Sequence, residues 1–156
     1  MQVSDIMRGD VKTADAEDTF ADVAKAMRSN GISSVVVLEQ DGELAGILTE
    51  RDIVNLVAAG GDPQSVKVAH GMTRRHLETV DVKTDIAVAA DRMVSLNIRH
   101  LPVLEKGKVV GILSIRDLTK WAAEELSGGH EMPDIARSQK ALAAASELQK
   151  QRRMSS

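Results

Sequence analysis

The chain repeats itself, and this repeat is the feature that most limits how it can fold. The segment GILTERDIVNLV, which begins at Gly46, returns as GILSIRDLTKWA from Gly111, at an offset of 65 residues. The same offset relates VSDIM at Val3 to VAHGM at Val68. Between these anchors the offset is 66, a slip of one residue of the kind that surface turns tolerate. We therefore expect two copies of one small unit to account for most of the 156 residues.

Each copy has the pattern of a β-α-β-β-α unit, so the predicted fold class is α+β. In the first copy, Phe20, Ala24 and Met27 recur at helical spacing after a short leading segment. Strand-like runs at 35–38 and 43–48 then flank a glycine-containing turn, and a second helix closes the unit. The corresponding elements of the second copy are a helix around Ile86, Ala90 and Met93 and strands at 101–104 and 108–113.

Paired glycines mark the ends of the copies, at 60–61 and at 128–129. We therefore divide the chain into a first domain at 1–62, a second domain at 63–127 and a tail at 128–156. Because a unit of about 60 residues buries little apolar surface, we expect the two domains to pack together. The alanine-rich composition of the tail predicts an appended helix. This helix would pack either on a partner protein or on the two domains of its own chain.

Composition excludes several classes of function. The chain has no cysteine, which removes disulfides, thiolate nucleophiles and thiolate metal sites. A net charge of −3 argues against a basic nucleic-acid or membrane surface. Phe20 and Trp121 are the only aromatic residues, so base stacking by several rings is also absent. With no membrane-length apolar run and no signal-peptide pattern at the N-terminus, we expect a cytoplasmic, soluble protein.

No catalytic constellation occurs in the sequence. There is no G-x-x-x-x-G-K-[ST] or G-x-G-x-x-G phosphate loop, and no serine lies in G-x-S-x-G. The histidines at 70, 76 and 130 match no metal-ligand spacing. We therefore expect neither an enzyme nor a metal site.

Both copies end in the signature G-h-x-[ST]-x-x-D, where h is apolar, and two interpretations of it stay open. Thr49 with Asp52, and Ser114 with Asp117, match a capping box at the start of a helix. The same helix start presents N–H groups to an anion, so capping and ligand binding can coexist. For the preceding helices, the expected N-cap is Asp18 or Thr19 in the first copy and Thr84 or Asp85 in the second.

The doubled signature resembles that of tandem cystathionine-β-synthase (CBS) domains, a pair often called a Bateman module. The resemblance covers about residues 3–126 and includes DIM near the N-terminus and the run IRHLPVL from Ile98. It implies a regulatory ligand-sensing module whose two domains pack about a pseudo-twofold axis. The clefts between the domains would bind AMP, ADP or ATP, or else S-adenosylmethionine, NAD or a cyclic dinucleotide, as regulatory ligands rather than catalytic cofactors.

The resemblance also assigns roles to single residues. The aspartates of the two signatures would take ribose hydroxyls, the adjacent Thr or Ser would contact ribose or phosphate, and the threonine of each leading segment would lie near the base. Arginine and histidine before Leu-Pro would meet phosphate, and the arginine before each aspartate either reaches phosphate or lies on a solvated helix face. The candidate ligand-binding residues are Thr13, Thr49, Arg51, Asp52, Thr79, Ile98, Arg99, His100, Pro102, Ser114, Arg116 and Asp117.

The two copies differ in charge where phosphate is expected. Arg99 and His100 of the second copy replace Ser33 and Ser34 of the first, so one cleft should bind phosphorylated ligands more tightly. The resemblance further implies a homodimer of modules, which we expect to regulate an unidentified protein in trans. From the charge and the apolar pattern, we expect neither nucleic acid nor a membrane as a partner. The alternative is a dimerisation or interaction scaffold whose clefts stay empty.

Overall fold

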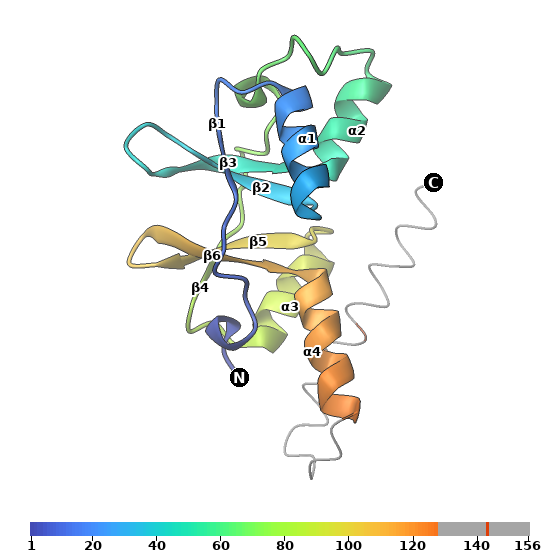
Figure 1. Cartoon of the computed structure of the whole chain (residues 1–156). Coiled ribbons are helices and arrows are strands. Elements are labelled where there is room, and N and C mark those ends of the chain that lie inside the picture. Colours follow the sequence, from blue (N-terminus) through green and yellow to red (C-terminus); the bar gives the residue numbers. More distant parts are fainter. Residues whose placement is uncertain (128–142, 144–156) are drawn as a thin grey trace. The chain divides into compact units, whose positions relative to one another are not determined.

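The computed structural model describes residues 1–127 and residue 143, and it divides into two compact units (Figure 1). The first-repeat unit is Asp10–Glu78. The second-repeat unit combines Met1–Gly9 with the chain from Thr79 onward. Each unit is described by itself below.

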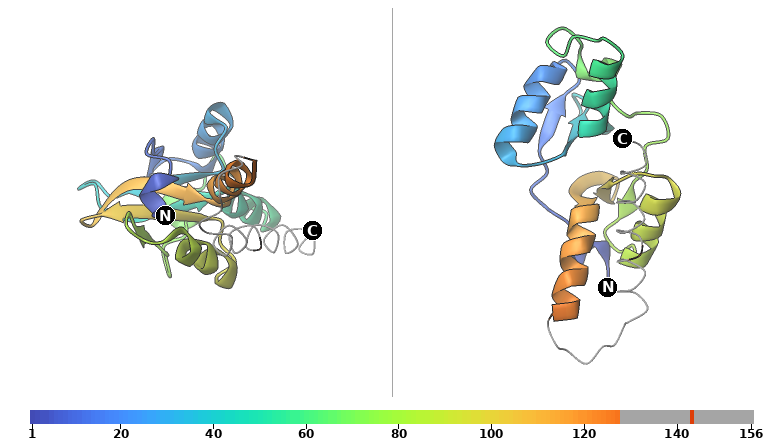
Figure 2. Two further views of the ribbon diagram at one scale, coloured as in Figure 1. Left: turned by 90° about the horizontal axis from the view of Figure 1, so that it is seen from below. Right: turned by 90° about the vertical axis from the view of Figure 1, so that its right-hand side faces the viewer.

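The first-repeat unit has the predicted β-α-β-β-α order. A three-stranded sheet has the order β1-β2-β3, with β1 parallel to β2 and β2 antiparallel to β3. Helices α1 and α2 lie on the same face of this sheet (Figures 1 and 2). The elements are β1 (Thr13–Asp15), α1 (Phe20–Asn30), β2 (Ser34–Leu38), β3 (Leu44–Thr49) and α2 (Glu50–Ala58), followed by a 3₁₀ turn at Val68–His70.

The sequence pattern of α1 explains both its start and its packing. Thr19 is the N-cap, and its hydroxyl oxygen accepts a hydrogen bond from the N–H of Asp22 at 3.1 Å. Phe20, Val23 and Met27, at positions i, i+3 and i+7, are buried against the sheet. Of the two N-caps left open by the sequence, Thr19 is therefore the one observed.

The second-repeat unit has the same order and a larger buried core. Its sheet has the order β4-β5-β6, and helices α3 and α4 complete the unit (Figure 1). Asp85 is the N-cap of α3, since its carboxylate accepts from the N–H of Ala87 at 2.8 Å. The elements are a 3₁₀ turn at Val3–Asp5, β4 (Val80–Asp81), α3 (Ile86–Ser95), β5 (His100–Glu105), β6 (Lys108–Ser114) and α4 (Ile115–Ser127).

Strand β4 begins one residue later than its counterpart β1, and Pro102 supplies a reason. In the first-repeat unit, the N–H of Val36 donates to the carbonyl of Lys12 at 3.1 Å, just before β1 begins. The residue 66 positions after Val36 is Pro102, which has no N–H to donate. Parallel pairing therefore starts at Val80.

The leading segment of each repeat pairs with the sheet of the other repeat. Arg8 pairs antiparallel with Ile112, and each N–H donates to the other's carbonyl at 3.0 Å. Thr73 pairs in the same way with Ile47, at 2.9 and 3.1 Å. The segment that opens each repeat therefore joins the sheet of the other repeat, and the compact units do not follow the sequence repeat.

This exchange explains the glycine that opens each signature. A Cβ atom on Gly46 would lie 2.7 Å from the carbonyl oxygen of Thr73 and 2.9 Å from Sδ of Met72. A Cβ atom on Gly111 would lie 2.5 Å from Sδ of Met7. Real Cβ atoms do not approach so closely, so a larger residue would force the backbone of the leading segment to shift at Gly46 and the Met7 side chain to move at Gly111.

The description of the two units does not address two of the sequence-based predictions, the tail helix and the pseudo-twofold packing. The predicted tail helix at 128–156 falls outside the described residues, except for residue 143, which is helical. Pseudo-twofold packing concerns the placement of one unit against the other, and it stays a prediction. Among the described helices, none has the length and apolar character needed to cross a membrane.

Candidate functional site

The signature of the first-repeat unit caps the N-terminus of α2. The carboxylate of Asp52 accepts from the N–H of Thr49 at 2.8 Å and from its hydroxyl at 3.1 Å, both at Oδ2. These two residues form a capping box, with Thr49 as the N-cap and Asp52 three positions later. Both are half-buried. The capping interpretation of the signature is confirmed here.

The second signature has the same geometry at the start of α4. Oδ2 of Asp117 accepts from the N–H of Ser114 at 2.8 Å and also from its hydroxyl. In return, the N–H of Asp117 donates to Oγ of Ser114 at 3.3 Å. Each unit therefore holds one carboxylate, in one orientation, at the N-terminus of its last helix.

The second oxygen of Asp52 contacts a residue that the sequence analysis missed. The hydroxyl of Thr73 donates to Oδ1 of Asp52 at 3.4 Å, across 21 residues of sequence. Thr73 belongs to the leading segment of the second repeat, so a motif confined to one repeat does not include it. The signal that can find it is the offset of 65, which makes Thr73 the counterpart of Arg8.

Strand register places several candidates of the first-repeat unit on one side of its sheet. Ser34 lies opposite Thr49, and Val36 lies between Thr13 on β1 and Ile47 on β3. Directly paired side chains emerge on the same side of a sheet, and so do residues two apart on a strand. The alternate residues Val35, Val37 and Leu48 pack in the helix-side core. We call the side opposite this core the signature face, defined in this unit by Thr13, Ser34, Val36, Ile47 and Thr49.

The second-repeat unit presents an equivalent signature face. His100 lies opposite Ser114, and Pro102 lies opposite Ile112, while Leu101, Val103 and Leu113 belong to the helix-side core. Thr79 immediately precedes Val80, which pairs with Val103. Alternation therefore puts Thr79 on the side of Pro102. The signature face of this unit consists of Thr79, His100, Pro102, Ile112 and Ser114.

The residues just before β5 are placed by backbone bonds. The carbonyl of Arg99 accepts from the N–H of Ile115 at 3.0 Å, and the carbonyl of Ser33 accepts from Glu50 in the same way at 3.1 Å. These matching bonds support the alignment of Arg99 with Ser33. Ile98 is half-buried and packs against the helix-side core.

Two candidate arginines lie on the first turns of the last helices. Arg51 on α2 and Arg116 on α4 are exposed and stand one residue before Asp52 and Asp117. This position agrees with either of the roles expected for them.

The two signature faces differ in burial where Ser34 and His100 occupy equivalent positions. Ser34 is buried, with 8% of its surface exposed, whereas His100 at the equivalent position is half-buried. Within residues 1–127, no group of three histidine, aspartate or glutamate side chains is placed to hold a metal ion.

Comparison with known proteins identifies the repeat. The model of the CBS domain family matches twice, at residues 3–59 and 68–124. An uncharacterized protein of Methanopyrus kandleri is 34% identical over 120 residues, which cover 76% of this chain and 61% of that protein. The chain thus spans less than two thirds of the length of this relative.

Solved structures of CBS domain proteins have the same fold. A CBS domain protein from Pyrobaculum aerophilum, complexed with AMP, is 29% identical with a TM-score of 0.70, covering 76% of this chain and 90% of that one. A CBS domain pair in complex with 5′-methylthioadenosine and S-adenosyl-L-methionine is 26% identical with a TM-score of 0.72, covering 84% and 98%. Two matches to the family, with the fold and the doubled signature described above, show that this chain belongs to the CBS domain family, as a tandem pair of CBS domains.

Proposed function

We propose that this protein senses an adenine nucleotide or a related adenosyl ligand on its signature faces and regulates a partner protein in trans. The observation that carries the proposal is the doubled pair of a hydroxyl residue and an aspartate. In each unit this pair is held at a helix N-terminus, beside strand residues of one sheet face.

The aspartates are suited to bind ribose. A carboxylate offers about four acceptor positions. In Asp117, Oδ2 takes two hydrogen bonds from Ser114, which leaves acceptor capacity for two vicinal hydroxyls. The same use of an acidic residue on a ribose occurs in dinucleotide-binding folds. Because the capping bonds fix the carboxylate before a ligand arrives, little side-chain entropy is lost on binding.

The relatives support the adenosyl class without selecting one ligand. One related structure is complexed with AMP, and another with 5′-methylthioadenosine and S-adenosyl-L-methionine. The shared part of these ligands is adenosine, which the ribose-binding aspartates would recognise. Arg99 and His100 would then favour a phosphorylated ligand in the second-repeat unit.

Regulation would follow from a population shift. A ligand that binds one conformation of the module more tightly than another shifts the equilibrium toward it, and a partner protein reads the change. Assembly into a homodimer of modules is part of the proposal, and catalysis is not. The alternative function is an interaction scaffold that binds no ligand on these faces.

A thermal-shift panel tests the proposal. The ligands are AMP, ADP, ATP, S-adenosylmethionine, NAD and a cyclic dinucleotide, each with the full chain. A one-site ligand at a hundred times its Kd stabilises the folded state by about 2.7 kcal/mol. For a chain of this length, this corresponds to a rise in Tm of about 5 to 10 °C. No shift with any of these ligands at millimolar concentration would favour the scaffold.

Two substitutions identify the main site. Asp52→Asn and Asp117→Asn each keep the size of the side chain and remove its charge. Each should weaken adenosine in its own unit, and the larger loss in calorimetry marks the unit that binds more tightly. Equal, negligible losses would contradict the assignment of ribose to these carboxylates.

A further inference from the structure

The exchanged leading segment brings an arginine to the sheet of the second-repeat unit. Arg8 and Ile112 donate to each other's carbonyls at 3.0 Å, so they form a hydrogen-bonded antiparallel pair. Directly opposed residues in such a pair project their side chains to the same side of the sheet. Ile112 belongs to the signature face, and Arg8 therefore does so too. Its side chain is exposed.

The register sets how close Arg8 lies to the proposed ligand residues. Ser114 is two positions beyond Ile112 and is thus a diagonal neighbour of Arg8, at a Cα separation of about 7–8 Å. His100 lies opposite Ser114 in the same row of the sheet. An arginine side chain is long enough to bridge a diagonal separation of this size. Arg8, Ser114 and His100 therefore border one patch of the signature face.

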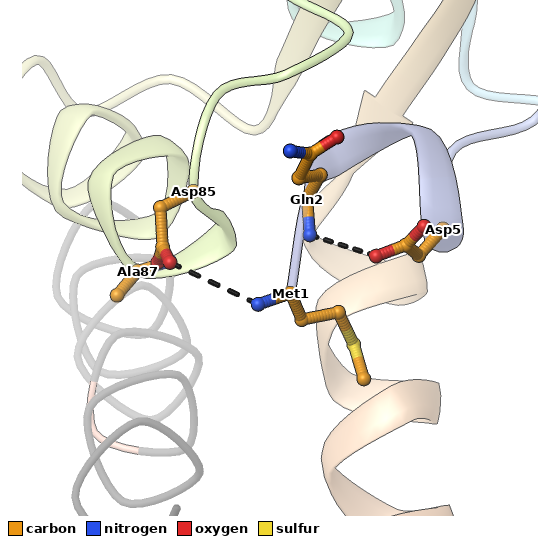
Figure 3. A network of polar contacts seen from close by, with 5 residues as sticks. All are labelled: Met1, Gln2, Asp5, Asp85 and Ala87. Atoms are coloured by element: carbon orange, nitrogen blue, oxygen red, sulfur yellow. Dashed lines mark hydrogen bonds and ion pairs between the residues drawn. The ribbon is translucent and has the colours of Figure 1, made fainter.

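Hydrogen bonds and an ion pair hold the segment that carries Arg8 in place. Val3 is fully buried, and its N–H donates to the carbonyl of Thr84 at 2.8 Å. The N–H of Gln2 donates to Asp5 at 2.8 Å, and the amino group of Met1 lies 3.9 Å from Oδ2 of Asp85 (Figure 3). The backbone of Arg8 is thus positioned before any ligand binds.

The first-repeat unit shows that this position reaches the signature aspartate. Thr73, the counterpart of Arg8, pairs with Ile47 in the same register, and its hydroxyl donates to Asp52. In the second-repeat unit the equivalent side chain is longer and carries a positive charge. The leading segment therefore adds a short neutral donor to one signature face and a cation to the other.

We infer that Arg8 is a phosphate-binding residue on the signature face of the second-repeat unit and sets its preference for phosphorylated adenosyl ligands. The inference rests on the proposed function. A guanidinium can bind two phosphate oxygens at once, which threonine at this position cannot do. Recognition of phosphate would thus depend on a residue that lies 109 positions before Asp117 in the sequence.

Calorimetry of AMP and adenosine binding to the full chain tests this role. Arg8→Ala keeps the backbone bonds of the segment, so its Tm without ligand should stay near that of the unaltered chain. It should weaken AMP by about 10- to 100-fold, the loss of a charge-assisted bond, and change adenosine by less than about 2-fold. Arg8→Lys should retain part of the AMP affinity, because it keeps the charge and loses the bidentate geometry.

A matched control separates a local contact from net charge. Arg28→Ala removes one exposed arginine from the last turn of α1, away from the signature face. It should leave both affinities unchanged. A loss for Arg28→Ala equal to that for Arg8→Ala would show that only overall charge matters, and would overturn the inference.

The remaining outcomes separate this inference from the proposed function. If the unaltered chain binds AMP and Arg8→Ala binds it equally well, the inference fails and the proposed function stands. If Arg8→Ala weakens AMP and adenosine to the same extent, Arg8 acts on Asp117 or the fold and does not bind phosphate. If the unaltered chain binds neither ligand, the proposed function fails and the inference fails with it.

Discussion

The two units share a backbone and differ in the side chains that this backbone presents. Both have a capped signature, a sheet crossed by the other repeat's leading segment, and a glycine at the crossing point. They differ on the signature face, where Ser34 and Thr73 of the first-repeat unit correspond in position to His100 and Arg8 of the second-repeat unit. Duplication of the scaffold therefore permits two faces with the same capped signature and different charge.

The last helices differ as well. Helix α4 buries Leu118, Trp121 and Ala122, whereas no residue of α2 is buried. Val54 and Val57 of α2 are 65% and 57% exposed. The second-repeat unit thus has the better-packed helix layer, and substitutions at matched positions can test how far the two units differ.

Shortening a buried side chain in the last helix of each unit should give the largest loss of stability. Leu118 is fully buried, so Leu118→Ala should lower the free energy of unfolding by about 2–5 kcal/mol. Ile53, its counterpart in α2, is half-buried, and Ile53→Ala should cost less than half as much. Urea unfolding followed by circular dichroism measures both. Equal losses would show that the two helices are equally packed, and the comparison would fail.

The charge difference beside the signatures should be seen in ligand binding. Arg99→Ala should weaken AMP by about 10- to 100-fold and leave adenosine almost unchanged, because a charge-assisted contact with phosphate is lost. Ser33→Ala, at the matched position, should cost tenfold at most, roughly the value of one neutral hydrogen bond. Calorimetry decides between them. If Arg99→Ala weakens adenosine as much as AMP, Arg99 does not contact phosphate.

Adding a methyl group at the crossing points tests the exchange of segments. In Gly46→Ala the new Cβ meets the backbone carbonyl of Thr73, which cannot easily move, whereas in Gly111→Ala it first meets the flexible end of Met7. Both substitutions should destabilise by about 1–3 kcal/mol, the first by more. Gly9→Ala is the control, since a Cβ there meets no atom within 4 Å. Differential scanning calorimetry measures all three, and a Gly46→Ala variant as stable as Gly9→Ala would contradict the crossing.

The helix caps should produce the smallest effect, and one that depends on pH. A hydrogen bond from the side chain of Thr19, followed by one from its backbone N–H, lowers the pKa of Asp22 below its ordinary value. The ionised carboxylate therefore stabilises the fold above the ordinary aspartate pKa, and this contribution is lost as pH falls through the lowered pKa. The matched position in α3 is Val88, which has no carboxylate.

Asp22→Asn tests this pH dependence. The Tm of the variant should lie below that of the unaltered chain at pH 7, and the two should converge in acid. Val88→Ala should show no such convergence. A Tm difference for Asp22→Asn that stays constant from pH 7 to pH 2 would exclude the ionised cap as its cause.

Much of the fold can be predicted from the sequence, because the signals are local and occur twice. Helical spacing in α1 and α3 and apolar runs at the β-hairpins predict elements that the structure confirms within one or two residues. The capping box of Thr49 and Asp52 is also local, since three residues separate the pair. Repetition strengthens each of these signals, because a pattern that recurs at a fixed offset indicates that both copies form the same structural unit.

The tertiary structure decided which residues share a face and which segment completes each sheet. The repeat shows that Arg8 and Thr73 are equivalent, but only strand pairing places them beside Ile112 and Ile47 of the other repeat. Likewise, the sequence shows the glycine of each signature. The reason for it is the close approach of the other repeat's leading segment, which only the structure reveals. Periodicity reports contacts along one element. Pairing between segments that are tens of residues apart depends on the packed core that brings them together.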